Sequence, residues 1–298
     1  MGATGRLEVE VRPRWPYRIP SRGGRDGVLR APGPGGLCRL LHVDGEPVAV
    51  GVRQPAPDRV VFRATGASGL EVAIERMRFA LGVDDDLSDF YAAFKRDPLI
   101  GPAVRSRPWH RPRRRPLAWE ALAWAVTEQL IEASRAAAIQ RRIVRRWGPR
   151  PEVGGERLRD VPAPGLIAGR APAELAAMDL APSRALALVR CAREVAAGRV
   201  DPASADGDRR LLRIAGIGPW TVQCLGFNGR GEPDSLPAGD LAYVKLVGRL
   251  VGLGRRATVP EVEEFFAPYA PYRGLAGSFV LAHWHKRVAG APPLRAAA

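Results

Sequence analysis

The sequence predicts a protein in two parts, an α+β domain with an antiparallel sheet followed by an all-α domain. Short β-type runs fill the first hundred of the 298 residues, and stretches rich in Ala and Leu fill the chain from Leu117 onward. A segment rich in Pro and Arg lies between them. We therefore expect the α+β domain over residues 1–100, a linker or crossing segment over 101–116, and a helical domain with room for two lobes over 117–298.

The first domain has four runs with the composition of strands and two with the composition of helices. Val and Leu recur in the strand runs, and Gly, Pro and Asp separate them. The predicted strands are Leu7–Val11, Leu37–Val43, Pro47–Val52 and Arg59–Ala64. The predicted helices run from Leu70 to about Leu81 and, after three aspartates, from Leu87 to Phe94.

The helical domain is predicted from the spacing of its apolar residues. Between Leu117 and Ala137 they recur at i, i+3, i+4 and i+7, which predicts one long helix with a single buried face. Further helices are predicted over residues 173–178, 183–197, 206–213, 219–225, 241–250, 260–266 and 275–286.

The charge of the chain points to a polyanionic partner. There are 46 Lys+Arg against 31 Asp+Glu, a net charge of +15, and residues 101–150 alone contribute +9. No apolar run approaches the roughly 20 residues that span a bilayer, and the first residues lack the apolar stretch of a signal peptide. We therefore expect a cytoplasmic protein associated with the nucleoid, with nucleic acid rather than a membrane as its partner.

The metal-binding residue types do not cluster in the sequence. Cys38, Cys191 and Cys224 are widely separated and odd in number, so they predict neither a disulfide framework nor an iron–sulfur cluster. His283 and His285 flank Trp284 without a third ligand nearby. We expect no metal site built from side chains.

Residues 211–222, LLRIAGIGPWTV, have the pattern of two helices joined by a tight turn. The turn is Gly216, Ile217 and Gly218, and Pro219 stands at the start of the second helix. Glycine allows positive φ and close backbone approach, and the amides of such a turn can hold one phosphate. A plain helix–helix turn is the alternative, and the spacing favours neither.

About twenty residues later, Asp240 stands directly before the helix predicted over 241–250. By itself this position is typical of an N-cap, because Asp is among the residues preferred there.

Together, the hairpin, the gap and the aspartate before a helix resemble the helix-hairpin-helix DNA glycosylase superfamily, and within it the bacterial 3-methyladenine DNA glycosylase II branch. The resemblance extends over almost the whole chain. It includes Phe90-Tyr91, Asp97-Pro98, Glu128-Gln129-Leu130-Ile131, Tyr272-Arg273 and Ala282-His283-Trp284-His285. It implies an enzyme of base excision repair that hydrolyses the N-glycosidic bond of alkylated purines flipped out of duplex DNA.

The resemblance also implies roles for single residues. Asp240 would be the catalytic carboxylate, which stabilises positive charge on the sugar and helps to activate water. The DNA-binding set would be Gly216, Ile217, Gly218, Thr221 and the apolar wedge Leu130, with a monovalent cation at the hairpin and no other cofactor. The base pocket would contain Trp220, Gln129, Trp284 and Tyr17, and the indole faces would attract a cationic purine. For Gln129 and Leu130 the alternative is ordinary helix packing.

Members of the superfamily that nick the backbone carry a lysine where this chain has Trp220, so the resemblance implies base release without strand cleavage. The implied partner is double-stranded DNA containing damaged bases, bound by a monomer. Two other functions stay open, an oxidised-purine glycosylase of the same fold and a noncatalytic hairpin protein that only docks on DNA. The run Arg111–Arg115 is either a phosphate contact or a solvated linker.

Overall fold

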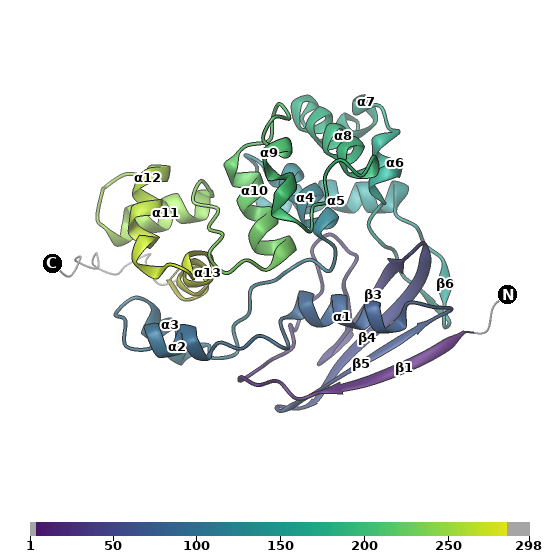
Figure 1. Cartoon of the computed structure of the whole chain (residues 1–298), viewed down its shortest axis with the longest axis horizontal. Helices are drawn as coiled ribbons and strands as arrows, with labels where there is room; N and C mark the ends of the chain where they lie inside the picture. Colours follow the sequence, from purple (N-terminus) through teal and green to yellow (C-terminus); the bar gives the residue numbers. More distant parts are fainter. Residues whose placement is uncertain (1–3, 285–298) are drawn as a thin grey trace.

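The computed structural model describes residues 4–284, and its N-terminal part is a sheet of five antiparallel strands (Figure 1). The order in the sheet is β1-β5-β4-β3-β2, which confirms the predicted antiparallel sheet. The strands are β1 (Gly5–Val11), β2 (Arg30–Gly33), β3 (Gly36–Val43), β4 (Glu46–Ala56) and β5 (Arg59–Gly66). Strand β2 was not predicted, because its sequence RAPG is short, exposed and without apolar alternation.

Each face of the sheet has its own cover. Along β4, Val48, Val50 and Val52 are buried on the face that packs against Ile74 of helix α1 (Leu70–Leu81). On the other face, a short hairpin of β6 (Glu152–Val153) and β7 (Glu156–Arg157) packs Val153 against Leu40. The sheet therefore has little apolar surface left for other helices.

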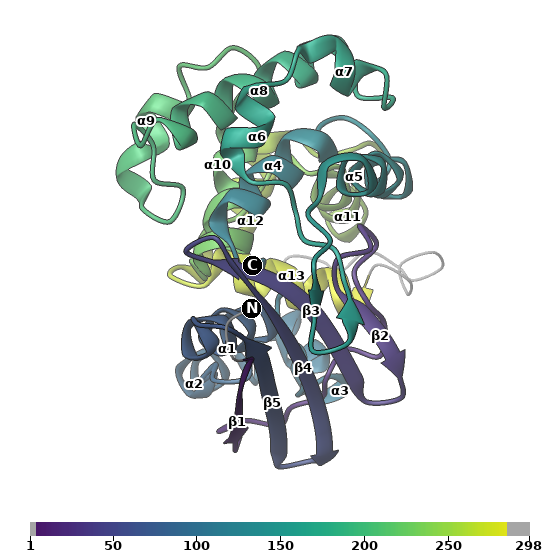
Figure 2. The same cartoon turned by 90° about the vertical axis from the view of Figure 1, so that its right-hand side faces the viewer.

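The helices form two further cores. The first helical lobe is built around Leu122, Ile139 and Leu188, and Figure 2 shows its helices above the sheet. It contains α4 (Ala118–Glu128), α5 (Ala133–Trp147), α6 (Pro164–Ala168), α7 (Pro172–Ala176), α8 (Pro182–Ala196), the turn η1 (Ala205–Gly207), α9 (Asp208–Leu211), α10 (Pro219–Leu225) and the π-helical turn η2 (Gly226–Arg230). The bounds of α10 agree with the helix predicted over residues 219–225. Its start could be predicted because proline is favoured at the first position of a helix, where Pro219 stands.

The second helical lobe joins two segments that are far apart in the sequence (Figure 1). It consists of α2 (Ser88–Phe94), α3 (Ile100–Ser106), α11 (Leu241–Leu250), α12 (Val259–Phe266), η3 (Ala267–Tyr269) and α13 (Arg273–Trp284). Phe90 stacks on Phe279 with ring centroids 5.3 Å apart, and Ile100 is buried in the same core. Among residues 4–284, no helix is long and apolar enough to cross a membrane.

The three cores divide the chain differently from the predicted boundaries at residues 100 and 116. Helices α2 and α3 belong to the core of the C-terminal helices and not to that of the sheet. The physical reason is that α1 already covers the apolar face of the sheet, so the apolar sides of α2 and α3 are buried elsewhere. Helix α3 also occupies the first part of the predicted linker.

The single helix predicted from Leu117 to Ala137 is wrong. Helix α4 ends at Glu128, and α5 begins at Ala133. Between them Leu130 has a φ of 55°, a left-handed conformation that no helix interior contains and that is uncommon for a branched residue. The apolar spacing continues through the break, so periodicity alone could not reveal it.

A buried ionic cluster joins the sheet to the first helical lobe. Arg39 of β3 forms two hydrogen bonds with the Glu120 carboxylate of α4, at 3.2 and 2.6 Å, and lies 3.5 Å from an oxygen of Asp160. Burial by itself would lower the pKa of Arg39, but the two carboxylates raise it, so the guanidinium stays charged. Arg115 adds ion pairs with Asp26 and Glu120. These contacts hold the two parts of the chain in a defined orientation.

Candidate active site

The hairpin between α9 and α10 presents free backbone amides. Gly216 has a φ of 92°, and a Cβ there would lie 3.3 Å from Ala187 of α8, so both conformation and space favour glycine. Gly218 is extended and open. Ile217 is buried, and its amide donates to the Ile214 carbonyl at 2.9 Å. Among the described residues, the amides of Gly216, Gly218 and Trp220 have no hydrogen-bond partner, so they can receive an anion.

Asp240 is the N-cap of α11. Its Oδ1 accepts a hydrogen bond from the Ala242 amide at 2.8 Å, and its own amide donates to the Pro237 carbonyl at 2.9 Å. The side chain is half-buried, and Oδ2 has no partner in the described part of the chain. One oxygen is therefore used for capping and the other is available for chemistry, so the two roles are compatible.

The hairpin and the aspartate come together through Trp220 and Gly239. A Cβ placed on Gly239 would lie 3.7 Å from Cδ1 of the Trp220 ring. Trp220 is half-buried, and its indole Nε1 is enclosed without a partner in the range 4–284. An indole donor and an indole face thus lie directly beside the residue that precedes Asp240.

Gln129 and Leu130 form the break between α4 and α5. The Gln129 side-chain amide donates to the Gly216 carbonyl and to Oγ1 of Thr221, both at 2.9 Å. Thr221 is buried, so the structure makes both residues braces of the hairpin. Leu130 has a fractional exposure of 101%, which excludes the helix-packing alternative for it. An exposed leucine in a strained conformation is typical of a functional loop tip.

Tyr17 and Trp284 form their hydrogen bonds with backbone carbonyls outside the hairpin and the Asp240 cap. Tyr17 is buried in the core of the sheet, where its hydroxyl donates to the Leu81 carbonyl at 3.2 Å and burial raises its pKa. The Trp284 indole donates to the Leu99 carbonyl at 3.2 Å. Within residues 4–284, no hydrogen bond or ring contact joins either side chain to Asp240 or Trp220. His285, which follows Trp284, lies outside the described residues.

The arginine run is mostly structural. Arg111 is buried and donates to backbone carbonyls, Arg114 pairs with Asp85, and Arg115 pairs with Asp26. Only Arg113 of this run has no hydrogen-bond or ion-pair partner among the residues the structure describes. Burial and the nearby charges of Arg115 and Arg25 lower its pKa. A guanidinium in this situation favours an anion.

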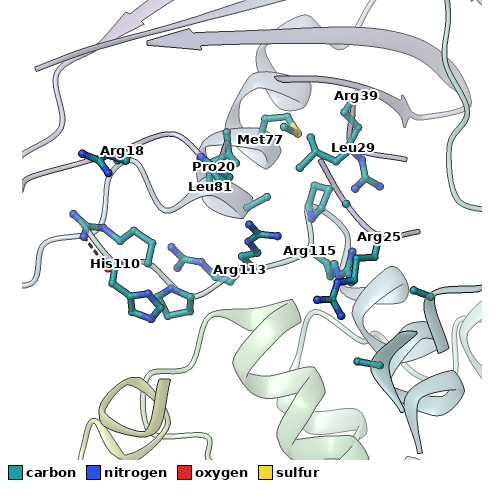
Figure 3. A pocket seen from close by; sticks show the side chains of 18 of the residues that line it. Arg18, Pro20, Arg25, Leu29, Arg39, Met77, Leu81, His110, Arg113 and Arg115 are labelled. Carbon is teal, nitrogen blue, oxygen red and sulfur yellow. Dashed lines mark hydrogen bonds between the residues drawn. The ribbon is translucent and has the colours of Figure 1, made fainter. Parts of the chain in front are cut away.

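Arg113 lines a cavity of about 330 Å³ between the sheet domain, the segment 109–116 and the start of α5 (Figure 3). We call it the linker cavity. Figure 3 shows Arg113 between Met77 and Leu81 on the sheet side and the helices on the other. Its helical side is formed by Glu128, Ala133, Ala137 and Gln140. This cavity could not be predicted from the sequence, because three segments that are distant along the chain form it.

The fold is similar to that of solved structures of DNA glycosylases. The chain superposes on the 3-methyladenine DNA-glycosylase of Archaeoglobus fulgidus with a TM-score of 0.78 at 19% identity, over 92% of this chain and 96% of that one. It also superposes on the 8-oxoguanine glycosylase/lyase of Clostridium acetobutylicum, with a TM-score of 0.69 at 15% identity, over 93% of this chain and 97% of that one. These likenesses establish the fold.

In sequence, the chain resembles a DNA-3-methyladenine glycosylase and a probable DNA repair enzyme. It is 27% identical over 205 residues to the DNA-3-methyladenine glycosylase of Bacillus subtilis, covering 65% of this chain and 66% of that protein. It is 28% identical over 228 residues to the probable bifunctional transcriptional activator/DNA repair enzyme AlkA of Mycobacterium tuberculosis, covering 74% of this chain and 45% of that protein. The matches thus span less than two thirds of each relative's length. No protein-family model matches the chain.

Proposed function

We propose that this protein is a monofunctional DNA glycosylase that hydrolyses the N-glycosidic bond of alkylated purines, of the 3-methyladenine type, in duplex DNA. The observation that carries the proposal is Asp240, a carboxylate with one free oxygen that directly follows Gly239, the residue packed beside the Trp220 ring. The name of the Bacillus subtilis relative supports the alkylated-purine substrate, and that of the Mycobacterium tuberculosis relative supports DNA repair.

The residues suggest a division of labour around an extruded nucleotide. The free amides of Gly216 and Gly218 would hold a phosphate, and Leu130 would fill the vacated stack. The C1′–N bond breaks with its electron pair leaving on the base, so a cationic alkylpurine departs neutral without a proton. Asp240 stabilises the positive sugar, a water oxygen bonds to C1′, and the released proton passes through Asp240 to solvent.

The product should be an abasic site in an intact strand. Trp220 offers no amine for a Schiff base, and Lys245 lies on α11 beside Arg249 and Arg256 in a different surface hollow. Duplexes carrying 3-methyladenine, 7-methylguanine, hypoxanthine, 1,N6-ethenoadenine, 8-oxoguanine or uracil would be incubated with the protein, and free base and strand breaks scored separately. We expect release of the alkylated purines, breaks only after alkali, and no covalent complex with borohydride.

Other outcomes of this assay identify the alternatives. A preference for 8-oxoguanine, or a trapped covalent complex, would indicate an oxidised-purine enzyme and contradict the proposal. Binding without release of any base would indicate the noncatalytic hairpin protein.

Replacing Trp220 with alanine should slow the release of cationic bases more than that of neutral ones. The face of an indole attracts a cation by about 0.5–2 kcal/mol, which corresponds to a factor of roughly two to thirty in rate. The measurement is single-turnover release of 7-methylguanine and of hypoxanthine by Trp220→Ala. Trp220→Phe, which keeps an aromatic face, should lose less. Equal slowing of both bases by the two variants would show that the ring only supports Gly239.

Replacing Arg113 with alanine should weaken the salt dependence of binding to undamaged duplex. A phosphate contact contributes about one unit to the slope of log K against log salt, and Arg113 is the unpaired arginine of the run. Arg114→Ala, which removes a partner of Asp85, serves as the matched control and should leave the slope unchanged. An unaltered slope in Arg113→Ala would make the whole run a structural linker.

We further propose that a monovalent cation is held at the hairpin. Within residues 4–284 no group of three or more His, Cys, Asp and Glu side chains could hold a metal ion, so backbone carbonyls would be the ligands. The carbonyls of Ile214 and Gly216 each accept one hydrogen bond and keep a second lone pair, which fits such a role. Replacing K⁺ by tetramethylammonium at constant ionic strength should weaken duplex binding.

The partner in this proposal is double-stranded DNA with a damaged base, bound by a monomer at the nucleoid. The two helical lobes would form the glycosylase unit, with the active cleft between them. Sedimentation of the protein with and without a duplex tests the one-to-one complex.

A further inference from the structure

The loop between α4 and α5 is not held in place by its own backbone. We call residues 129–132 the wedge loop, because Leu130 stands at its tip. Leu130 has a φ of 55° and is fully exposed, so packing of its own side chain does not fix this conformation. In the described part of the chain, none of the backbone amides of residues 130–132 donates to another backbone carbonyl. A branched residue in a left-handed conformation is strained, and it persists only where its surroundings fix it.

The contacts that fix the wedge loop meet at Gln129. Its side-chain amide donates to the Gly216 carbonyl and to Oγ1 of Thr221. Its backbone carbonyl accepts a hydrogen bond from Nη1 of Arg184 at 2.5 Å. This carbonyl belongs to the planar peptide unit that joins Gln129 to Leu130, so its direction limits the backbone angles on both sides. Arg184 therefore acts on the backbone directly before the tip.

Arg184 reaches the wedge loop from a helix that also supports the hairpin. It lies in the first turn of α8, which begins at Pro182. A Cβ on Gly216 would lie 3.3 Å from Cβ of Ala187 and 4.0 Å from the Ser183 carbonyl oxygen. Helix α8 also packs against α4, the helix that precedes the wedge loop. The start of α8 thus has both the hairpin turn and the wedge loop as neighbours.

The Arg184 guanidinium is not engaged in an ion pair. It is half-buried, and it has no carboxylate partner among the described residues. The acid whose charge acts on it is Asp179, which accepts two hydrogen bonds from Arg135, at 3.1 and 2.7 Å. Burial and the charge of Arg135 lower the pKa of Arg184. The Gln129 carbonyl is therefore the main polar contact of this arginine in the protein.

We propose that Arg184 is a positioning residue, which holds the wedge loop so that Leu130 enters the duplex in its left-handed conformation. This inference rests on the proposed function, in which Leu130 fills the stack that the flipped nucleotide leaves. Arg184 acts through the Gln129 carbonyl and does not touch the base. Because the Gln129 side chain is fixed to the hairpin, the wedge and the phosphate-binding amides keep a set spacing. A tip that is ordered before DNA arrives avoids the entropic cost of ordering it during insertion.

The test is a double-mutant cycle between Arg184 and Leu130. The measurement is single-turnover release of 7-methylguanine, with thermal unfolding recorded on the same samples. We expect Arg184→Met to slow release about tenfold, a typical effect of losing a hydrogen bond from a charged donor. Leu130→Ala removes the wedge and should slow release by a similar factor. In the Leu130→Ala protein, adding Arg184→Met should slow release less than about twofold, because no wedge is left to position.

Two further variants separate this role from a general loss of structure or charge. Arg184→Lys keeps a donor for the Gln129 carbonyl and should recover most of the rate. Arg190→Met removes an exposed arginine of the same helix that has no hydrogen-bond or ion-pair partner in the range 4–284. Its effect should be the same with and without Leu130→Ala.

Insertion of the wedge can also be followed directly. A 2-aminopurine base beside the lesion brightens when it unstacks, and this rise should be slow in Arg184→Met and near normal in Arg184→Lys. Binding to undamaged duplex should keep its salt dependence in Arg184→Met. A flatter dependence would overturn the inference in favour of a direct phosphate contact.

The cycle distinguishes failure of this inference from failure of the proposed function. Release by Arg184→Met at the wild-type rate, equal slowing by it with and without Leu130→Ala, or no recovery in Arg184→Lys would overturn the inference alone. Release by Leu130→Ala at the wild-type rate would overturn it too, since there would be no wedge to position, although base release would still support the glycosylase. A wild-type protein that releases no base would overturn the proposed function and this inference with it.

Discussion

Replacing Asp240 with asparagine is expected to abolish base release while leaving the fold and DNA binding in place. Asparagine keeps an oxygen that can accept the Ala242 amide at the N-cap, so α11 should remain intact. It removes the negative charge that is needed when the sugar becomes positive. Loss of one such preorganised electrostatic contact typically slows an enzyme by about 10²–10³-fold, and we expect at least this effect.

The measurement is single-turnover release of 7-methylguanine, with duplex affinity and thermal unfolding recorded on the same samples. Asp89→Asn, at an exposed aspartate of α2 without a side-chain partner among the described residues, is the matched control and should behave as wild type. Release by Asp240→Asn near the wild-type rate would contradict the catalytic role. Unfolding of this variant would show that the cap alone matters.

Replacing Arg39 with methionine should cause the largest loss of stability of any single change considered. The Glu120 carboxylate has no exposed surface and receives two hydrogen bonds from Arg39. Methionine would leave the Glu120 carboxylate with Arg115, at 3.3 Å, as its remaining charged partner. Asp160, in contrast, would keep its hydrogen bonds with His42 and Val161. Removing one member of a buried ion pair costs about 3–5 kcal/mol in the free energy of unfolding.

Denaturant unfolding of Arg39→Met measures this loss. Arg63→Met removes the partner of Glu8 on the same sheet, where both side chains are more than 40% exposed, and should lose far less. The double variant Arg39→Met with Glu120→Gln should recover part of the stability, because the uncompensated charge is gone. A loss in Arg39→Met no greater than in Arg63→Met would refute the argument that this cluster holds the sheet to α4.

The local features of the fold could be predicted because their causes are local. Alternating apolar residues predicted β3 and β5, and Pro219 and Asp240 marked the starts of α10 and α11. The hairpin and Asp240 were recognised as a pair through the resemblance to the helix-hairpin-helix DNA glycosylases. Trp220 was assigned with them, and it does lie beside Gly239.

The roles of side chains at long range could not be predicted in this way. Gln129 matches a pocket residue in the resemblance, yet its amide is used on Gly216 and Thr221, which are distant in sequence. Leu130 follows the apolar spacing of a buried helix face, yet its left-handed backbone places it fully in solvent. Neither outcome is encoded in the residues within one helical turn.

The sequence by itself determined the classes of element and the helix starts at Pro219 and Asp240, because these depend on backbone preferences within a few residues. The pairing of the hairpin with the aspartate followed from the resemblance to a known family. Only the tertiary structure decided that α2 and α3 join the C-terminal helices, since that depends on which apolar faces remain uncovered. The tertiary structure also decided which arginines form ion pairs with carboxylates. Arg115 meets Asp26, while Arg113 keeps a free charge beside the cavity that contains Glu128, because charge pairing depends on distance in space and not along the chain.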